Sequence, residues 1–249
     1  MRFKSRRREP IVSDDDLKRR LEELEHRLGV LEDVHAIRRL HHLYGYFIDK
    51  CMYDEAVDCY DEECEIHFFG GIFRRLAGAR RMYCDGFRNR FTDGKNGPVF
   101  GFLLDHPQMQ DVVDVSPDRT TALARFRCMM QAGTHYERNP NPASVSRQWW
   151  EGALYENAYI KRDGVWKIKM LNYRPVWICT FENGWAFTPP EFVALQTTTY
   201  PEDPYGPDEL TDYTPLRWPE HEVLPFHCVH PVTGEPIVTP PPGSAPRKD

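Results

Sequence analysis

Long stretches with the two-residue periodicity of β-strands constrain the fold of this chain most. We expect four such strands, at residues 100–115, 120–132, 149–161 and 165–180. The segment Arg162-Asp163-Gly164 is short enough, and has the right residues, to join the last two as a tight hairpin. The pattern therefore predicts a run of long antiparallel strands in the second half of the domain.

Helical patterns come before these strands. Apolar residues at helical spacing predict a helix at 34–49, a short helix at 53–60 and a third helix at 78–90, and two short strands at 63–69 and 72–75 lie between them. This order is typical of the α+β class. We expect a cone-shaped α+β barrel, in which a curved antiparallel sheet carries helices on its concave face. A pocket would then lie between the sheet and the helices.

Most of the 21 prolines lie late in the chain and separate a tail from the rest. We expect three parts: a disordered arm at 1–16, an α+β domain at 17–181 and a C-terminal arm at 182–249. The last part is rich in proline and aromatic residues and keeps large apolar residues such as Phe192 and Leu216, which a disordered tail would lack. We therefore expect an ordered but irregular arm, frayed at 239–249, lying over the domain or a neighbouring subunit. Residues 133–148 are a candidate lid.

Composition argues against two classes of partner. The formal net charge is −6, whereas nucleic-acid-binding proteins usually carry a basic surface, so we expect no nucleic-acid partner. No apolar run approaches membrane-spanning length, so we expect no membrane partner. The seven cysteines show no paired spacing and follow no signal peptide, which indicates reduced thiols and a cytoplasmic location.

Five leucines repeat at the 4-3-4-3 spacing of a heptad seam, namely Leu17, Leu21, Leu24, Leu28 and Leu31. Ser13 or Asp14 can cap the helix that carries them. The repeat covers only about two heptads, which is short for a coiled coil. We interpret it as a helix that packs on its own domain or on a neighbouring subunit. Together with the aromatic tail, the repeat predicts a homo-oligomer.

A carboxylate, Asp49, ends the first helix of the domain. Burying an acid at the end of an apolar helix is costly without a partner, and we predict that this partner is His106. Strand alternation places His106 on the face of Phe102 and Leu104, and Pro107 should disturb the strand beside it. A histidine held by a carboxylate at one ring nitrogen can take a proton with the other. Alternatively, His106 is a core histidine bonded to a backbone carbonyl.

Further side chains are candidates for binding a substrate around this pair. Tyr44 and Tyr46 lie on the helix that ends at Asp49. Asn172 shares a strand face with Trp166 and Ile168, which would turn its amide inward to bind a substrate oxygen or to cap a buried backbone group. Aromatic residues that would line the cavity, or simply fill the core, are Phe126, Trp150, Tyr159 and Tyr173.

We expect no cofactor and no metal ion. The chain contains neither a His-Glu-x-x-His motif nor a pair of closely spaced cysteines, the strong signatures of zinc sites. His227, Cys228 and His230 are either a packed turn or a fragment of a metal site. Gly70 and Gly71 lack the spacing and the following helix of a phosphate loop. By exclusion, any chemistry is acid–base chemistry without a cofactor.

Three segments of the chain resemble the SnoaL-like branch of the NTF2-like superfamily. They are the helix at 36–49 with its Phe-Ile-Asp-Lys ending, the Asp61-Glu62-Glu63 segment before a strand, and the hairpin at 159–168. The resemblance covers about residues 33–180. The spacing of Asp49 and His106 is similar to that of the catalytic Asp–His pair in two enzymes of this branch, hexachlorocyclohexane dehydrochlorinase and scytalone dehydratase. Because the histidine is the base and the aspartate orients it in those enzymes, the resemblance implies the same roles here.

Departures from those enzymes limit what the resemblance implies. Tyr44 stands where the dehydrochlorinase has a lysine, and Leu171 or Asn172 where it has an arginine, which argues against a halide leaving group. The length and aromatic richness resemble bacterial lyases that release formaldehyde from lignin-derived diols. We therefore expect a lyase that eliminates water or formaldehyde from a bulky aromatic diol. The alternatives are a polyketide cyclase or isomerase with the same dyad, and a non-catalytic ligand-binding protein or β-type partner subunit. Relatives in this branch form trimers or dimers, which the resemblance implies here too.

Overall fold

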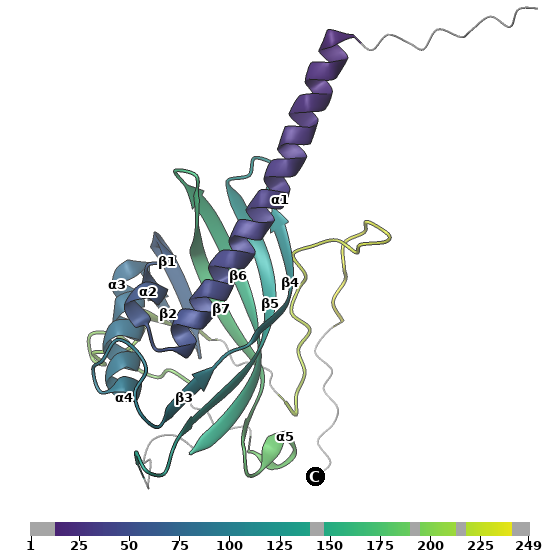
Figure 1. The fold of residues 1–249 in the computed structure, drawn as a ribbon. Coiled ribbons are helices and arrows are strands. Elements are labelled where there is room, and N and C mark those ends of the chain that lie inside the picture. The colour runs from purple at the N-terminus through teal and green to yellow at the C-terminus, as the bar shows by residue number, and fades with distance from the viewer. Residues whose placement is uncertain (1–12, 140–146, 190–194, 213–217, 241–249) are drawn as a thin grey trace, which may run out of the picture.

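One bent sheet of eight strands forms the body of the molecule (Figure 1). The computed structural model describes residues 13–139, 147–189, 195–212 and 218–240 of the chain. Along the sheet the strands are ordered β3-β5-β6-β7-β1-β2-β8, and β4 also pairs with β5. The strands are β1 (Tyr60–Phe68), β2 (Gly71–Arg74), β3 (Phe102–Asp105), β4 (Gln108–Val115), β5 (Thr121–Thr134), β6 (Gln148–Arg162), β7 (Val165–Thr180) and β8 (Glu209–Leu210).

The long strands β5, β6 and β7 pair antiparallel, as predicted. The hairpin between β6 and β7 is also confirmed, with Arg162 opposite Val165 and positive φ angles of 49° at Asp163 and 80° at Gly164. In contrast, β1 runs parallel to β7, so the sheet is mixed rather than antiparallel throughout. No hairpin joins β1 to β7, and so no local turn sets their relative direction. The α+β class with a curved sheet is confirmed, but the sheet stays open and does not close into a barrel.

A proline divides the strand predicted at residues 100–115. Strand β3 ends at Asp105 and β4 begins at Gln108, and both strands pair with β5. Pro107 has no N–H group to donate to the ladder, which explains the interruption. The break leaves His106 between two strand segments, where its backbone N–H is available to another partner.

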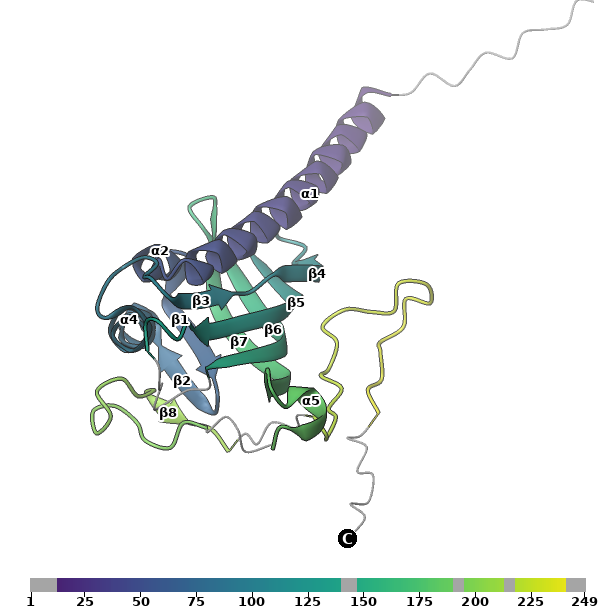
Figure 2. The same ribbon diagram turned by 60° about the horizontal axis from the view of Figure 1, so that its bottom comes forward.

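The helices are α1 (Asp14–Asp49), α2 (Tyr53–Val57), α3 (Arg75–Arg80), the π-helical η1 (Arg81–Phe87), α4 (Arg88–Thr92) and α5 (Gly184–Phe187). The leucine-rich helix and the helix predicted at 34–49 are one continuous element, α1, because no proline separates them. Ser13 caps α1, its hydroxyl accepting a hydrogen bond from the Asp16 N–H at 3.2 Å. The second half of α1 crosses one face of the sheet, and the first half projects beyond it (Figures 1 and 2). In the part of the chain that the structure describes, no helix is long and apolar enough to cross a membrane.

The core lies between the second half of α1, the helices at 75–92 and the inner face of the sheet. From α1 it receives Ile37, Tyr44 and Ile48, which recur at helical spacing on one stripe. The sheet and the other helices contribute the remaining large buried side chains, including Ile66, Phe73, Tyr83, Phe126, Tyr155, Ile168, Leu171 and Tyr173. This packing holds α1 against the sheet, with the last turn of the helix beside the β3–β4 break.

The C-terminal arm packs on the edge of its own sheet (Figure 2). Strand β8 pairs with β2, and the Gln196 N–H donates to the Phe69 carbonyl at 2.8 Å. Further along, the Trp218 N–H donates to the Val176 carbonyl at 2.8 Å. Several predictions lie outside the described residues, namely those on 1–12, most of the candidate lid (140–146), Phe192, Leu216 and 241–249.

Candidate active site

A cavity of about 670 Å³ lies between α1, the sheet, the helices at 75–92 and the C-terminal arm. Its polar lining includes His106 and Glu151. The arm contributes Leu195, Gln196 and Thr198, which sequence reasoning did not place because the arm has no regular pattern. The remaining wall is largely aromatic, with Tyr44, Phe68, Phe69, Tyr83, Phe87, Phe91, Trp149, Tyr155 and Tyr173.

His106 and Asp49 meet on the wall of this cavity. His106 Nδ1 lies 3.0 Å from Asp49 Oδ1, and the His106 backbone N–H donates to the same oxygen at 2.6 Å. Both side chains are only 11% exposed. A neutral imidazole that donates from Nδ1 to this carboxylate carries its electron pair on Nε2. The carboxylate thus sets the tautomer and the orientation of the ring, which lines the cavity.

Gln108 supports this pair from behind. Its amide Nε2 donates to the His106 carbonyl at 3.0 Å, and its Oε1 accepts a hydrogen bond from His41 Nε2 at 3.0 Å. Burial lowers the pKa of His41 to about 3, so this histidine is neutral. Gly45 makes room for the amide, because a Cβ atom there would lie 2.8 Å from Gln108 Cγ. The segment that carries His106 is therefore tied to α1 at two points.

Two of the predicted cavity residues surround His41 instead. Phe126 stacks on the His41 ring with the ring centroids 3.8 Å apart, and the Tyr159 hydroxyl lies 3.1 Å from His41 Nδ1. Both side chains point inward, as strand alternation predicted, but they lie beneath α1 and do not line the cavity. We expected both residues to contact a substrate, but in the structure they pack in the core. Alternation predicts that a side chain points inward, whereas its position along the strand decides which part of the interior it reaches.

Two further candidate residues, Tyr46 and Trp150, do not line the cavity. Tyr46 is 68% exposed, because it lies about 200° around the helix from Tyr44, which does line the cavity. Trp150 packs against Phe181 outside the cavity, and its neighbour Trp149 lines the wall instead. In a strand, adjacent side chains point to opposite faces, so a choice between the two tryptophans depends on the register.

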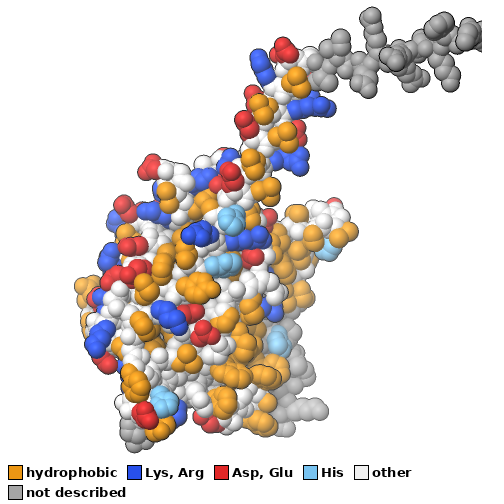
Figure 3. Space-filling view, viewed as in Figure 1, with side chains coloured by type: hydrophobic (Ala, Val, Ile, Leu, Met, Phe, Trp, Pro, Cys, Tyr) orange, Lys and Arg blue, Asp and Glu red, His pale blue; other side chains and the backbone are white. Residues whose placement is uncertain are grey.

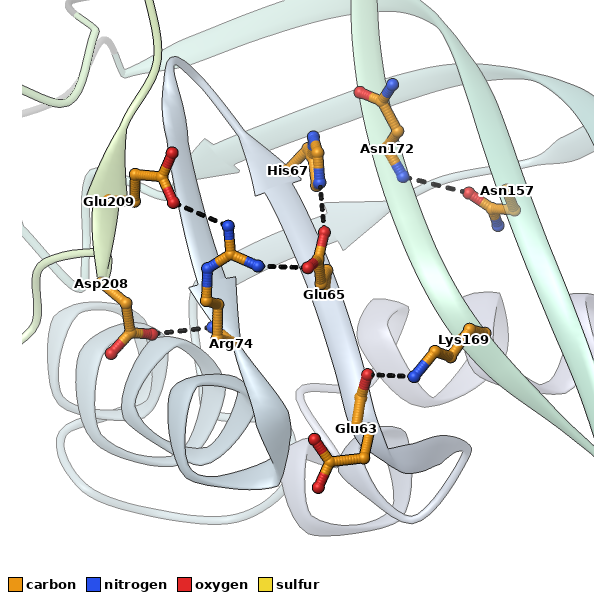
Figure 4. Close-up of polar contacts among 9 residues, drawn as sticks. All are labelled: Glu63, Glu65, His67, Arg74, Asn157, Lys169, Asn172, Asp208 and Glu209. Atoms are coloured by element: carbon orange, nitrogen blue, oxygen red, sulfur yellow. Dashed lines mark hydrogen bonds and ion pairs between the residues drawn. The ribbon is translucent and has the colours of Figure 1, made fainter.

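Asn172 does not line the main cavity, and a β-bulge explains why. Ala158 pairs with Met170 and Tyr159 pairs with Ile168, so Lys169 is an extra residue in β7. The alternation of faces is reversed beyond this bulge. Asn172 therefore lies in a separate cleft of about 120 Å³ that also contains His67. Figure 4 shows its backbone N–H donating to Asn157 at 3.2 Å.

Glu151 is a site residue that sequence reasoning missed. This carboxylate is 5% exposed and accepts hydrogen bonds from the Tyr173 hydroxyl at 2.7 Å and from Trp149 Nε1 at 2.9 Å. Burial, together with the charge of Glu151, raises the pKa of the Cys128 thiol to about 12. The signal was available, because strand alternation places Glu151 and Trp149 on the same face as Tyr155.

Three tyrosine hydroxyls form a chain at one side of the cavity. The hydroxyl oxygen of Tyr83 lies 2.7 Å from that of Tyr44 and 3.1 Å from that of Tyr60. Burial raises the pKa of Tyr83 to about 12 and also raises those of Tyr44 and Tyr60. The three phenols are therefore neutral near pH 7, and because their two mutual hydrogen bonds use two of the three hydroxyl protons, one proton is left to donate elsewhere. Tyr44 was predicted from the sequence, whereas Tyr83 was not.

Comparisons with known proteins agree with this architecture. A hexachlorocyclohexane dehydrochlorinase (LinA) of type 2 matches with a TM-score of 0.50 and 20% identity, over 66% of this chain and 97% of that one. LinA type 3 from Novosphingobium barchaimii LL02 matches with a TM-score of 0.49 and 21% identity, over 66% of this chain and 99% of that one. A candidate scytalone dehydratase from Novosphingobium aromaticivorans DSM 12444 matches with a TM-score of 0.48 and 18% identity, over 61% of this chain and 89% of that one. At 20% identity, the similarity to the type 2 enzyme concerns the fold alone.

Sequence comparison assigns the family. Among curated proteins, no sequence matches this chain. The family model described as a SnoaL-like domain matches residues 29–172, which is more than half of the chain and contains both Asp49 and His106. The chain therefore belongs to the SnoaL-like domain family.

Proposed function

We propose that this protein is a cofactor-independent lyase in which His106, held by Asp49, removes a proton from an aromatic substrate. The observation that carries the proposal is the hydrogen bond between His106 Nδ1 and Asp49 on the wall of a large aromatic cavity. A base needs one ring nitrogen fixed and the other within reach of the substrate, and this proposal is supported by the Nδ1 contact with Asp49 and by the position of the ring on the cavity wall.

The proton transfer follows from the geometry of the pair. Nε2 of His106 accepts a proton from a carbon or a hydroxyl group of the substrate, and the imidazolium that forms is stabilised by the Asp49 carboxylate at 3.0 Å. The His106 N–H holds the same carboxylate oxygen at 2.6 Å, so Asp49 need not move during the transfer. General base catalysis of this kind contributes about 10²- to 10⁴-fold to a rate.

The tyrosine hydroxyls are placed to donate hydrogen bonds to the oxygen that leaves the substrate. When the proton leaves carbon, a C=C bond forms, a C–O bond breaks and water leaves. When the proton leaves a hydroxymethyl group, a C–C bond also breaks, and formaldehyde is released with water and an alkene. In both cases a hydroxide must be stabilised and protonated, and the hydrogen-bonded hydroxyls of Tyr44 and Tyr83 on the cavity wall can donate a hydrogen bond to it. The proton that His106 took up then passes from its imidazolium to the departing hydroxide, which completes the water molecule and restores the neutral base.

The size and lining of the cavity support one class of substrate. A volume of about 670 Å³ is in the range that holds a drug-sized molecule. Its nine aromatic side chains favour flat, aromatic ligands through stacking and edge-to-face contacts. The buried carboxylate of Glu151 can accept a hydrogen bond from a phenol or an alcohol. We infer a bulky phenolic diol as the substrate class.

Matched histidine variants test the proposal. A panel of phenolic 1,3-diols is incubated with the protein, and released formaldehyde and the absorbance of a conjugated alkene are measured. His106→Ala and Asp49→Asn should each lower turnover by about a hundredfold or more. His67→Ala is the control, because His67 also pairs with a carboxylate, Glu65 at 3.1 Å, but lies outside the main cavity (Figure 4).

Three outcomes would contradict the proposal. If His106→Ala and Asp49→Asn keep the activity of the unaltered protein, the pair is not the catalytic group. If the protein rearranges or cyclises these compounds without releasing formaldehyde or water, the reaction is that of an isomerase or a cyclase. If the protein binds them without any conversion, the cavity serves binding alone.

A further inference from the structure

The first half of α1 projects from the domain with its leucines uncovered. Leu17, Leu21, Leu24, Leu28 and Leu31 are each between 53% and 67% exposed. Figure 3 shows hydrophobic side chains along this projecting helix, with charged side chains between them. A helix this long without packing contacts is marginal in water, because most helical stability in proteins comes from burying one face. The leucine seam therefore needs a cover.

Among the described residues, the domain packs on the other side of α1 and does not cover the seam. Gly29 and Asp33 face the body, where Arg119 fits against Gly29 and its guanidinium donates to Asp33 at 2.6 Å. Lys161 and Trp166 also bond to Asp33, which fixes this side of α1 to the sheet. In heptad terms the leucines occupy positions a and d, whereas Gly29 and Asp33 occupy b and f on the opposite side. The seam is thus held pointing away from the domain.

We propose that a second copy of this chain covers the seam, as a parallel and in-register coiled coil. The charged residues beside the seam favour a parallel over an antiparallel pair. Arg20 and Arg27 occupy position g, and Glu25 and Glu32 occupy position e. In a parallel pair, each g residue faces the e residue five positions later on the other helix. Arg20 then faces Glu25 of the second copy, and Arg27 faces Glu32.

An antiparallel pair would place like charges together. Position g then faces g and position e faces e, so arginine meets arginine and glutamate meets glutamate. The seam also has a defined end, since the next a and d positions are His35 and Arg38, and Arg38 is bound to Asp111 of its own domain at 2.5 Å. Helix pairing therefore stops at Leu31, about 27 Å along the helix from Asp49 at 1.5 Å per residue.

Disulfide trapping tests the arrangement in the full-length protein. Leu28→Cys places a thiol at position a, where two parallel, in-register helices bring identical residues together. His26→Cys is the matched control, because position 26 is an exposed f position on the same turn. After mild oxidation, non-reducing electrophoresis should show a linked dimer for Leu28→Cys and little for His26→Cys. This reaction reports on the helix itself, whatever other contacts hold copies of the domain together.

Charge reversal then tests the pairing in the Leu28→Cys background. Arg20→Glu with Arg27→Glu, and Glu25→Lys with Glu32→Lys, each create like-charged g–e contacts and should slow linking about tenfold. The chain with all four substitutions restores opposite charges and should link at the original rate. Circular dichroism establishes that the helix persists in each variant.

Two results would overturn the proposal. Equal linking of Leu28→Cys and His26→Cys would show that the seam does not face a second copy in register. Linking of the fourfold variant that is as slow as that of the double variants would show that g–e pairing does not select the partner.

Discussion

Acidification should destabilise this protein through His41, a buried histidine with neutral partners. Burial lowers the pKa of His41 from its ordinary value of 6.5 to about 3, and the hydrogen bond to Gln108 only partly opposes this effect. Below about pH 6.5 the unfolded chain binds a proton that the folded chain does not bind, so the unfolded state gains stability as the pH falls. The contribution of His41 to the free energy of unfolding therefore decreases between pH 6.5 and about pH 3.

The size of the effect follows from the two pKa values. Each pH unit between them is worth about 1.4 kcal/mol. Between about pH 7.5 and about pH 5, His41 should remove about 2 kcal/mol from the free energy of unfolding. His41→Gln removes the titrating ring and keeps an amide that can contact Gln108 and Tyr159. The variant should therefore lose about 2 kcal/mol less than the unaltered protein over the same interval.

Urea unfolding at several pH values, at one protein concentration, measures this difference. All other titrating groups are the same in both proteins, so the difference between the two pH profiles isolates His41. The ring of His41 can also be followed directly by NMR. Parallel pH profiles for the two proteins, or a His41 ring that titrates near pH 6.5, would refute the reasoning.

Two further substitutions test contacts of α1. Asp33→Ala should lower the free energy of unfolding by about 3 kcal/mol, because it leaves the cations of Arg119 and Lys161 without their buried partner. Urea unfolding measures the loss, and Glu23→Ala on the exposed part of the same helix is a control that should change it little. Gly45→Ala should cost about 1 kcal/mol even though alanine favours helices, because its Cβ would lie 2.8 Å from Gln108 Cγ. A rise in Tm for Gly45→Ala would contradict this account.

Local signals explain why the sequence led to Asp49 and His106. Asp49 ends a stretch of clear helical periodicity, and Pro107 marks the strand break beside His106. Each position was therefore fixed by its own neighbours in the sequence. Their contact over 57 residues followed from the cost of burying a lone carboxylate, and the structure brings the two side chains together.

Two of the misplaced residues, Asn172 and Trp150, depended on strand register. A single extra residue, Lys169, reverses the faces of β7 and turns Asn172 away from the cavity. The residues around 169 carry no signal for this bulge, so alternation alone could not detect it. Glu151 was different, because unbroken alternation from Tyr155 already placed it inward.

Local sequence patterns could not predict which distant strands pair with each other. The parallel pairing of β1 with β7, and the addition of β8 to β2, join segments about 100 or more residues apart without a connecting turn. The cavity wall formed by the arm depends on these contacts. The sequence indicated that the arm had enough apolar residues to pack, but it did not indicate where.

The position of the arm has a consequence for how such a protein can diversify. The histidine–carboxylate pair comes from α1 and the β3–β4 break, whereas Leu195, Gln196 and Thr198 enter the wall after the last long strand. The arm can therefore lengthen, shorten or change composition without altering the register of the sheet or the position of the pair. One part of the cavity wall is therefore encoded apart from the histidine–carboxylate pair, so substitutions in the arm can reshape that part while the pair keeps its geometry.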